Sequence, residues 1–348
     1  MNVLYFVVCI FFNLKRLYYL LIVLNFINIS KMALPIVIPN VIFSHDGNLD
    51  DLISLIVLIS SHKKGKINLV GVFITPADSF LESALFATRK IIDIMKLENV
   101  IIGVCDEAGI NPFPDEWRKT PYSVCHMPSI LRDGEPRSVV SNELGHIVLA
   151  NMINNLDGNI TLVETGPLTC IAKALAFITS ENKNKITNLI WMGGSIDVAG
   201  NIETFTKHDG TAEWNSYWDP VSAECVFKSG LPITMCPLDT TNNVPITTDF
   251  LRKLAIGSNG NIFGDLVVQI YAIIGKCFGV QNYYAWDILT VSYLLAPNIF
   301  EIKDAKISIY PDGDSQGRTY RCDTGADIKY LSNVDVNKWE NLLISYLN

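Results

Sequence analysis

The sequence predicts an α/β fold: a Rossmann-like, mostly parallel central sheet flanked by helices in a single domain, with the active site at the carboxyl ends of the strands. Short apolar, β-branched runs alternate with stretches of helical spacing, which is typical of βα units. Polar residues follow several of these runs directly, at the edge where open α/β sheets bind ligands. At 348 residues, with 49% hydrophobic and 18% charged residues, the chain has room for one large or two small globular domains.

The first predicted strand, Ile36 to Phe43, leads into an acidic loop and then into a helix. The apolar positions from Leu49 to Ile59 place one broad stripe on that helix. Three carboxylates and an amide fall at the turn between the two elements: Asp46, Asn48, Asp50 and Asp51. Carboxylates this close repel one another, and a cation that takes oxygen ligands, calcium or magnesium, offsets such repulsion. A solvated acidic first turn is the alternative, but the strand before the loop and the helix after it favour a metal site.

The next two βα units add further polar and aromatic candidates. A second strand, Ile67–Ile74, precedes Asp78, which is either a site residue or the cap of a helix predicted over Phe80–Met95. A third strand precedes a long irregular stretch, about residues 106–140, that contains five prolines. Loops of this length inside a domain are usually lids or binding loops. Trp117 in this loop either packs the loop against the domain or stacks on a ligand.

The later strand ends carry a turn and several amide and carboxylate residues. The strand Asn159–Glu164 ends in Thr165-Gly-Pro, a turn that frees backbone carbonyls toward the site. A strand over Ile186–Met192 ends in Gly-Gly, and three polar residues follow it: Asn201, Glu213 and Asn215. Each of these alone is an ordinary loop residue, so their order and spacing carry the prediction. Asp287 opens an apolar helix and is either its cap or a ligand.

Charge, cysteine spacing and the first residues exclude some classes of protein. The net charge is −8 and no basic cluster is present, which argues against binding to nucleic acid. The eight cysteines show no Cys-x-x-Cys and no zinc spacing, so we expect reduced core cysteines. Residues 1–31 form an apolar leader whose two runs are too short for a membrane span and lack a signal-peptide cleavage site. This leader is either an annotation extension or a targeting segment, and the domain is expected to cover residues 32–348.

Taken together, the motifs resemble the nucleoside hydrolase family over essentially all of residues 36–348. The acidic loop is similar to the signature of the purine-specific, inosine–adenosine–guanosine-preferring branch. Four further motifs follow in the family's order: Thr165-Gly-Pro-Leu-Thr169, Met192-Gly-Gly194, Gly200-Asn201 with Ala212-Glu-Trp-Asn215, and Trp286-Asp287. Trp286 stands where the broad-specificity branch has the histidine that protonates the leaving base, which is the purine-specific pattern. Two residues depart from the family: Ser44 replaces the first Asp of the signature, which lowers the expected calcium affinity, and Cys170 replaces a common Asn.

The resemblance implies calcium-dependent hydrolysis of the N-ribosidic bond of purine nucleosides to free base and ribose, as in purine salvage. The implied Ca²⁺ ligands are the Thr165 carbonyl and the carboxylates of Asp46, Asp51 and Asp287. Asp46 is also the implied general base, and Trp117 and Trp286 are expected to sandwich the leaving purine. The implied substrate-binding residues are Asn48, Asp50, Asp78, Asn201, Glu213 and Asn215.

Other functions stay open on the sequence. A broad-specificity hydrolase would also cleave pyrimidine nucleosides, although Trp286 argues against it. A catalytically weak nucleoside- or ribose-binding protein would keep the pocket without turnover. A metal phosphatase with an Asp nucleophile is a further alternative, but this sequence lacks a matching downstream Lys motif. The resemblance also implies a homo-oligomer, with a dimer expected, and a cytoplasmic location; secretion or membrane anchoring through residues 1–31 is the alternative, and only then is membrane contact expected.

Overall fold

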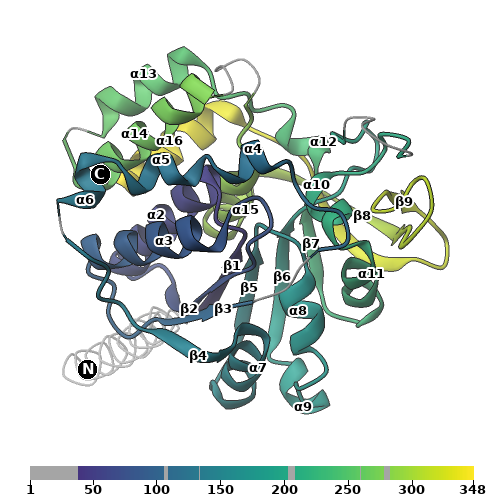
Figure 1. Ribbon diagram of the computed structural model, residues 1–348. Helices are drawn as coiled ribbons and strands as arrows, with labels where there is room; N and C mark the ends of the chain where they lie inside the picture. Colours follow the sequence, from purple (N-terminus) through teal and green to yellow (C-terminus); the bar gives the residue numbers. More distant parts are fainter. Residues whose placement is uncertain (1–37, 106–108, 133, 203–207, 259, 278–282) are drawn as a thin grey trace, which may run out of the picture. The chain divides into compact units, whose positions relative to one another are not determined.

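The computed structural model describes residues 38–348 except 106–108, 133, 203–207, 259 and 278–282 (Figure 1). The predicted leader, residues 1–31, and the start of the predicted domain at Met32 lie outside the described residues. Among the residues that are described, no helix combines the length and the apolar character that a membrane crossing requires.

One sheet of ten strands runs through the described part of the chain, in the order β4-β3-β2-β1-β5-β6-β7-β10-β8-β9. The strands from β4 to β10 in this order are parallel to their neighbours, whereas β8 pairs antiparallel with β10 and β9 with β8. The predicted mostly parallel sheet is therefore confirmed. The strand bounds are β1 Asn40–His45, β2 Asn68–Ile74, β3 Ile101–Val104, β4 Val140–Leu144, β5 Ile160–Glu164, β6 Ile186–Met192, β7 Ile233–Cys236, β8 Phe300–Ile309, β9 Thr319–Arg321 and β10 Ala326–Val334.

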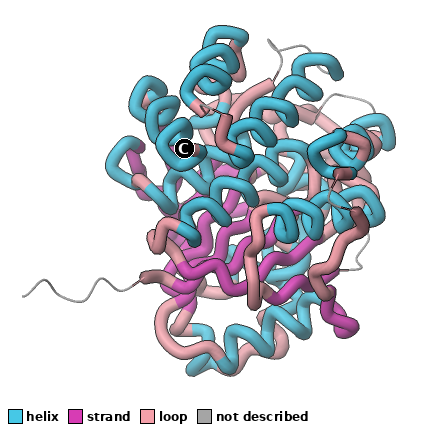
Figure 2. The backbone as a smooth tube through the Cα atoms, turned by 90° about the vertical axis from the view of Figure 1, so that its left-hand side faces the viewer, coloured by secondary structure: helices cyan, strands magenta, loops and turns pink. Residues whose placement is uncertain are grey.

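Helices cover both faces of this sheet (Figure 2). Successive residues of a strand point to opposite faces, so Val41 and Phe43 of β1 enter one hydrophobic core and Ile42 enters the other. The first core includes α2 (Leu49–Lys63), α3 (Leu81–Ile94), α14 (Ile262–Cys277), α15 (Trp286–Leu295) and α16 (Val336–Leu347). The second includes α7 (Gly145–Asn155), α8 (Thr169–Ala174) and α11 (Pro220–Lys228). Apart from three short helices before β4, the other helices are α9 (Ser180–Lys183), α10 (Trp214–Trp218), α12 (Leu238–Thr241), α13 (Thr248–Gly257) and the 3₁₀ turn η2 (Pro297–Ile299).

Helix α2 is more buried than its sequence pattern predicts. Every residue from Leu49 to Ser61 is buried, although the spacing predicted a single apolar stripe. The helix packs against α3, α14, α15 and α16 as well as the sheet, so its polar residues also lie inside the protein. This burial places the acidic first turn of α2 inside the protein, where an ionised carboxylate is costly in free energy unless it is paired.

The stretch of residues 106–140 is not irregular throughout, so that prediction was wrong. It contains three short helices, α4 (Asp115–Arg118), α5 (Pro121–Cys125) and α6 (Pro128–Leu131), before β4 begins at Val140. Pro121 and Pro128 lie in the first turn of α5 and α6, where a missing N–H costs nothing. Prolines that suggested an unstructured loop therefore start helices here. We call residues 113–131 the lid.

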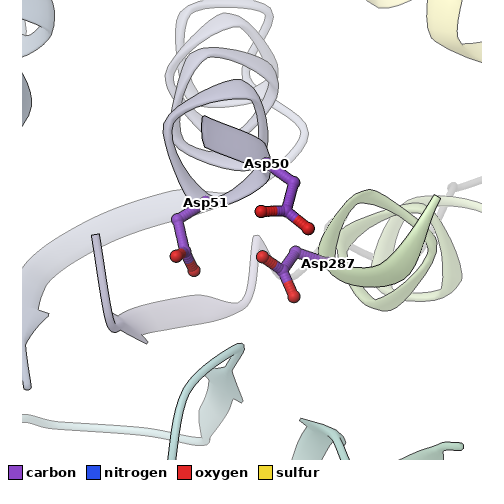
Figure 3. A group of neighbouring side chains, drawn as sticks. All are labelled: Asp50, Asp51 and Asp287. Carbon is purple, nitrogen blue, oxygen red and sulfur yellow. The ribbon is translucent and has the colours of Figure 1, made fainter. Parts of the chain in front are cut away.

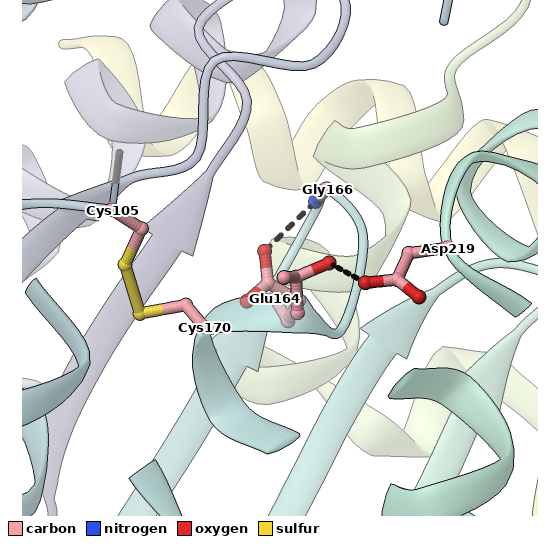
Figure 4. Close-up of a disulfide and its surroundings, with 6 residues drawn as sticks. Cys105, Glu164, Gly166, Cys170 and Asp219 are labelled. Carbon is pink, nitrogen blue, oxygen red and sulfur yellow. Dashed lines mark hydrogen bonds between the residues drawn. A yellow bond between two sulfur atoms is a disulfide. The ribbon is translucent and has the colours of Figure 1, made fainter. Parts of the chain in front are cut away.

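The expectation of reduced core cysteines was wrong for one pair. Cys105, just after β3, and Cys170, on α8, form a disulfide with their Cα atoms 6.0 Å apart (Figure 4). The two cysteines are 65 residues apart in the sequence, and only the return of the chain at β5 brings them together. Four other described cysteines are free: Cys125, Cys225, Cys236 and Cys322.

Candidate active site

A pocket lies at the carboxyl ends of β1, β2, β5 and β6, where the sequence predicted the site. Its empty volume, including the mouth open to solvent, is about 890 Å³. Carboxylates and amides supply its polar lining: Asp46, Asn48, Asp50, Asp78, Asn201, Glu213, Asn215 and Asp287. Thr165, Met192 and a set of aromatic residues complete it: Phe113, Trp117, Trp214, Tyr283 and Trp286. Every predicted site residue except Asp51 lines this one pocket.

Asp51 is fully buried beneath the pocket and belongs to its acidic cluster. One carboxylate oxygen from each of Asp50, Asp51 and Asp287 lies within 4.8 Å of the others (Figure 3). The sequence placed Asp51 and Asp287 among the metal ligands but assigned Asp50 to the substrate. In the described structure Asp50 belongs to the same cluster, because α2 and α15 bring their first turns together.

Burial and mutual repulsion shift the acidity of these carboxyls upward. Burial, followed by the charge of Asp51, raises the pKa of Asp50 to about 7. The pKa values of Asp46 and Asp287 rise well above their usual range, again mainly through burial and then through their acidic neighbours. No Lys, Arg or His in the described part of the chain lines the pocket to offset this charge.

Local structure explains why the acidic loop takes this shape. Asn48 caps α2 in a capping box, in which the Asn48 N–H donates to Asp51 Oδ2 at 2.8 Å. Gly47 has φ of +88°, and a Cβ at that position would lie 2.3 Å from the Ala84 Cβ. Only glycine fits, so the turn is set by its sequence and by the packing of α3.

The carboxylate and carbonyl oxygens of this site are the kind of ligand atoms that a hard divalent cation such as calcium binds. Thr165 comes directly after β5, and its hydroxyl donates to Asp51 Oδ1 at 2.5 Å. The Thr165 carbonyl accepts from Asn215 Nδ2 at 2.9 Å and keeps a second lone pair. Buried carboxylates together with a backbone carbonyl are the ligand types that calcium takes. Asp50, Asp51 and Asp287 lie close enough together to hold such an ion. Asp46 and Thr165 line the same pocket and stay predicted ligands.

Asp78 lies in the pocket and is not a helix cap. Phe80 is the cap residue of α3 and has no side-chain capping bond. Asn48 Nδ2 donates to Asp78 Oδ2 at 2.7 Å and to the Asp78 carbonyl at 2.8 Å. The other carboxylate oxygen, Oδ1, is buried and has no hydrogen-bond partner among the described residues. Asp78 therefore keeps an unused acceptor beside the pocket.

The amides and the glutamate expected to hold substrate are already bound to the protein itself. Asn48 Oδ1 accepts from Leu49 N and from Thr120 Oγ1, both at 2.7 Å. Glu213 caps α10, accepting from Asn215 N at 2.8 Å and Ser216 N at 3.1 Å. These contacts fix the side chains in place. The amide nitrogen and the amide oxygen of Asn48 both have protein partners, so Asn48 positions the acidic loop and is not free to bind a ligand.

Two aromatic groups line the pocket, one from the lid region and α10, the other from α15 and the residues before it. Trp214 stacks on Phe113 with ring centroids 4.8 Å apart and meets Trp117 edge-on at 5.4 Å. Tyr283 meets Trp286 edge-on at 4.7 Å. The indole N–H of Trp286 is buried without a partner in the described structure.

Sequence reasoning missed Phe113, Met192 and Trp214 as pocket residues. Trp214 lies between Glu213 and Asn215 in the motif, so its position was a usable signal. From the sequence, Tyr283 is either a hydrogen-bonding residue of the site or a packing residue; it lines the pocket and hydrogen-bonds to Asp50. Phe113 lies in the lid, and its contact with Trp214 depends wholly on tertiary structure.

Comparisons with known proteins agree with this geometry. The family model described as inosine-uridine preferring nucleoside hydrolase matches residues 41–341. The solved inosine-uridine preferring nucleoside hydrolase of Bacillus anthracis is 33% identical, with a TM-score of 0.82 over 89% of this chain and 99% of that chain. A purine-preferring ribonucleoside hydrolase from Gardnerella vaginalis shares the fold at 20% identity, with a TM-score of 0.72 over 88% of this chain and 98% of that chain.

Curated relatives match over shorter segments. The pyrimidine-specific ribonucleoside hydrolase RihA of Photobacterium profundum is 34% identical over 174 residues, 49% of this chain and 52% of that protein. The non-specific ribonucleoside hydrolase RihC of Escherichia coli is 31% identical over 177 residues, 51% of this chain and 55% of that protein. The chain thus spans about half the length of these curated relatives. On the family model and the full-length structural match, the chain belongs to the inosine-uridine preferring nucleoside hydrolase family.

Proposed function

We propose that the protein hydrolyses the N-ribosidic bond of purine nucleosides, with calcium, to give free base and ribose. The observation that carries this proposal is the joint lining of one pocket by a buried carboxylate cluster and by aromatic side chains. Carboxylates suit the hydroxyls of a ribose and the positive charge of its transition state, and aromatic faces suit a purine base.

Cleavage of the bond passes through an oxocarbenium-like ribosyl cation, as in glycoside hydrolysis. A calcium ion held by the acidic cluster would supply positive charge that orients a water molecule and two ribose hydroxyls. Asp46 accepts the proton of the attacking water, a role typically worth ~10²–10⁴-fold in rate. Glu213, buried in the pocket wall, favours the cation that develops on the sugar.

The purine preference rests on the aromatic residues around the base. Trp117 and Trp286 are proposed to stack on the leaving purine, and each cation–π contact with a protonated base contributes roughly 0.5–2 kcal/mol. No histidine of the described chain lines the pocket, so a protein acid of that kind does not assist the leaving group. A purine is protonated at N7 by solvent in this scheme, which a pyrimidine base cannot match.

A broad-specificity hydrolase is the second candidate, because the curated relatives are named pyrimidine-specific or non-specific. The two proposals differ in one measurable ratio, the kcat/KM for inosine over that for uridine. The proposed function predicts a ratio well above ten, and a ratio near one would support the second candidate.

The test is a panel of inosine, adenosine, guanosine, uridine and cytidine, each with calcium or with a chelator, following release of the free base. We expect release from the purine nucleosides, loss of that release in chelator, and recovery when calcium is returned. Calcium-dependent binding without base release would favour the nucleoside- or ribose-binding alternative and contradict the proposed enzyme.

The expected homodimer and cytoplasmic location are proposals as well. Light scattering on the purified chain tests the dimer. Disulfides persist mainly in oxidising compartments, so the Cys105–Cys170 bond gives weight to the secretory or membrane-anchored alternative. Locating the full-length protein in its own cells decides between the two.

A further inference from the structure

Glu164 is a buried carboxylate beneath the pocket that the proposed mechanism does not use. It is the last residue of β5, directly before Thr165, and its side chain is inaccessible to solvent. Its Oε1 accepts a hydrogen bond from the Gly166 N–H at 3.0 Å (Figure 4). Burying a carboxylate is costly unless it is hydrogen-bonded, and for Glu164 the Gly166 N–H supplies that hydrogen bond.

The bond to Glu164 is one of several that hold the Thr165–Gly166 turn. The Thr165 N–H donates to the Ser44 carbonyl at 3.0 Å, and Trp191 Nε1 donates to the Gly166 carbonyl at 3.0 Å. Glu164 fixes the remaining group, the N–H of Gly166. The peptide between Thr165 and Gly166 includes the Thr165 carbonyl, so this bond acts together with the one from Asn215 Nδ2 to set where that oxygen points.

The same turn also supports Asp46. A Cβ on Gly166 would lie 2.9 Å from the Asp46 Cβ and 3.1 Å from the Asp46 backbone nitrogen, so the turn packs directly on this residue. A shift of the turn therefore moves two members of the candidate cation site, the Thr165 carbonyl and Asp46.

Glu164 stands opposite Ser44, one of the two residues at which the motifs of this sequence depart from the family they resemble. Ser44 of β1 is the register partner of Glu164 on the adjacent parallel strand, and residues paired in this way point to the same face. Ser44 Oγ and Glu164 Oε2 are both buried, and no hydrogen bond of ordinary geometry joins them to any described group. At this pair of facing positions, β5 contributes a carboxylate and β1 contributes only a hydroxyl.

We propose that Glu164 is a positioning residue of the cation site, which holds the Thr165–Gly166 turn in place from β5 where Ser44 offers no carboxylate from β1. This inference rests on the proposed calcium-dependent function. It assigns Glu164 no contact with substrate, and its effect is transmitted through the Thr165 carbonyl and Asp46.

The test compares calcium affinity, measured by titration calorimetry on the full chain, between wild type and four variants. Glu164→Met removes the acceptor with little change of size, and Glu164→Gln is the matched control because its amide oxygen still accepts from Gly166 N–H. A third variant, Ser44→Asp with Glu164→Ser, moves the carboxylate to β1. Glu164→Ala repeats the loss of the acceptor with a smaller side chain if the Met variant does not fold.

We expect Glu164→Met to weaken calcium binding by roughly 10–100-fold, the usual effect of removing a partner of a metal ligand. The calcium affinity of Glu164→Gln should stay within about threefold of wild type. The double variant Ser44→Asp with Glu164→Ser should bind calcium about tenfold more tightly than Glu164→Met, which recovers most of the loss. A merely structural residue would change the melting temperature and leave calcium affinity as it is. Unchanged affinity in the Met and Ala variants would overturn this inference alone, whereas no calcium binding by wild type would overturn the proposed function and this inference with it.

Discussion

Asp46 has the most demanding chemical role among the individual residues. It follows β1, is buried, and packs against the Thr165–Gly166 turn. Asp46→Asn keeps the shape and removes the base, so we expect kcat to fall by ~10²–10⁴-fold while inosine still binds. Steady-state kinetics and calorimetric binding of inosine measure the two effects. Asp327→Asn on the exposed part of β10 is the control, and a variant at Asp46 that turns over at the wild-type rate would remove the assigned role.

Trp286 tests whether the aromatic residues assist the leaving group. Trp286→Ala should lower kcat/KM for inosine by roughly 2–30-fold, the equivalent of one lost cation–π contact of 0.5–2 kcal/mol. p-Nitrophenyl riboside needs no protonation of its leaving group, so kcat/KM for this substrate should fall only slightly in the variant. Tyr293→Ala, also on α15 but outside the pocket lining, is the control for packing. Equal losses for inosine, uridine and the nitrophenyl riboside would show that Trp286 only packs.

At the scale of elements, the lid is joined to the acidic loop through one buried hydroxyl. Thr120 Oγ1 lies 2.7 Å from Asn48 Oδ1 and 2.8 Å from the Trp117 carbonyl. Arg118 adds a second anchor, since its guanidinium donates to the Ser79 carbonyl and lies 4.4 Å from the centre of the Phe80 ring. The position of Trp117 therefore depends on contacts with the β1–α2 and β2–α3 loops.

Thr120→Val tests this link because valine matches the shape of threonine without the hydroxyl. Losing a hydrogen bond worth about 1 kcal/mol should reduce kcat/KM for inosine roughly fivefold. Ser123→Ala, on an exposed position of α5, is the matched control and should be neutral. Inosine kinetics that are the same in both variants would mean that the lid is held without Thr120.

The disulfide ties the chain after β3 to α8, across the turn that carries Thr165. Closing a loop of 65 residues should stabilise the domain by on the order of 2–4 kcal/mol. We expect a reductant, or Cys105→Ser with Cys170→Ser, to lower the melting temperature by several degrees. Cys225→Ser, at an exposed free cysteine, is the control. Alkylation of both Cys105 and Cys170 in unreduced protein, detected by peptide mass mapping, would refute the bond.

For the whole molecule, the acidic cluster links stability, pH and calcium. Without a cation the folded protein raises the pKa of Asp50 to about 7 from an ordinary value of 3.8, so it binds more protons than the unfolded chain between these pH values. Stability from this group is present at low pH and is lost as pH rises toward about 7. Calcium binds the ionised form, so the melting temperature should rise more on adding calcium at pH 8 than at pH 5.5.

Thermal melts with calcium and with a chelator at both pH values measure this effect. Asp50→Asn is the control, because an amide neither titrates nor repels its neighbours. In this variant the calcium-induced rise in melting temperature should differ less between pH 5.5 and pH 8 than in wild type. A calcium-induced shift of equal size at pH 5.5 and pH 8 in wild type would contradict the coupling.

The sequence by itself determined the fold class, the family and the polar residues that line the pocket. Period-two and helical spacing are local, so the bounds of β6 and the starts of α2 and α15 could be predicted closely. The polar residues after strands were predictable because parallel strands end at one edge. The resemblance to the family assigned Asp46, Thr165 and Asp287 to one site, although they lie far apart in the chain.

Only the tertiary structure decided which of these groups meet and which have other partners. The joining of Asp50 to the metal cluster, the Cys105–Cys170 bond and the Phe113–Trp214 stack all depend on contacts between segments distant in sequence. The short helices of the lid lack enough residues to show a period, so local pattern could not predict them. Glu164 appeared in the sequence as an ordinary strand residue. Its bond to Gly166 is local, but Ser44 lies opposite Glu164 only because β5 pairs with β1, and pairing between strands is a property of the folded chain.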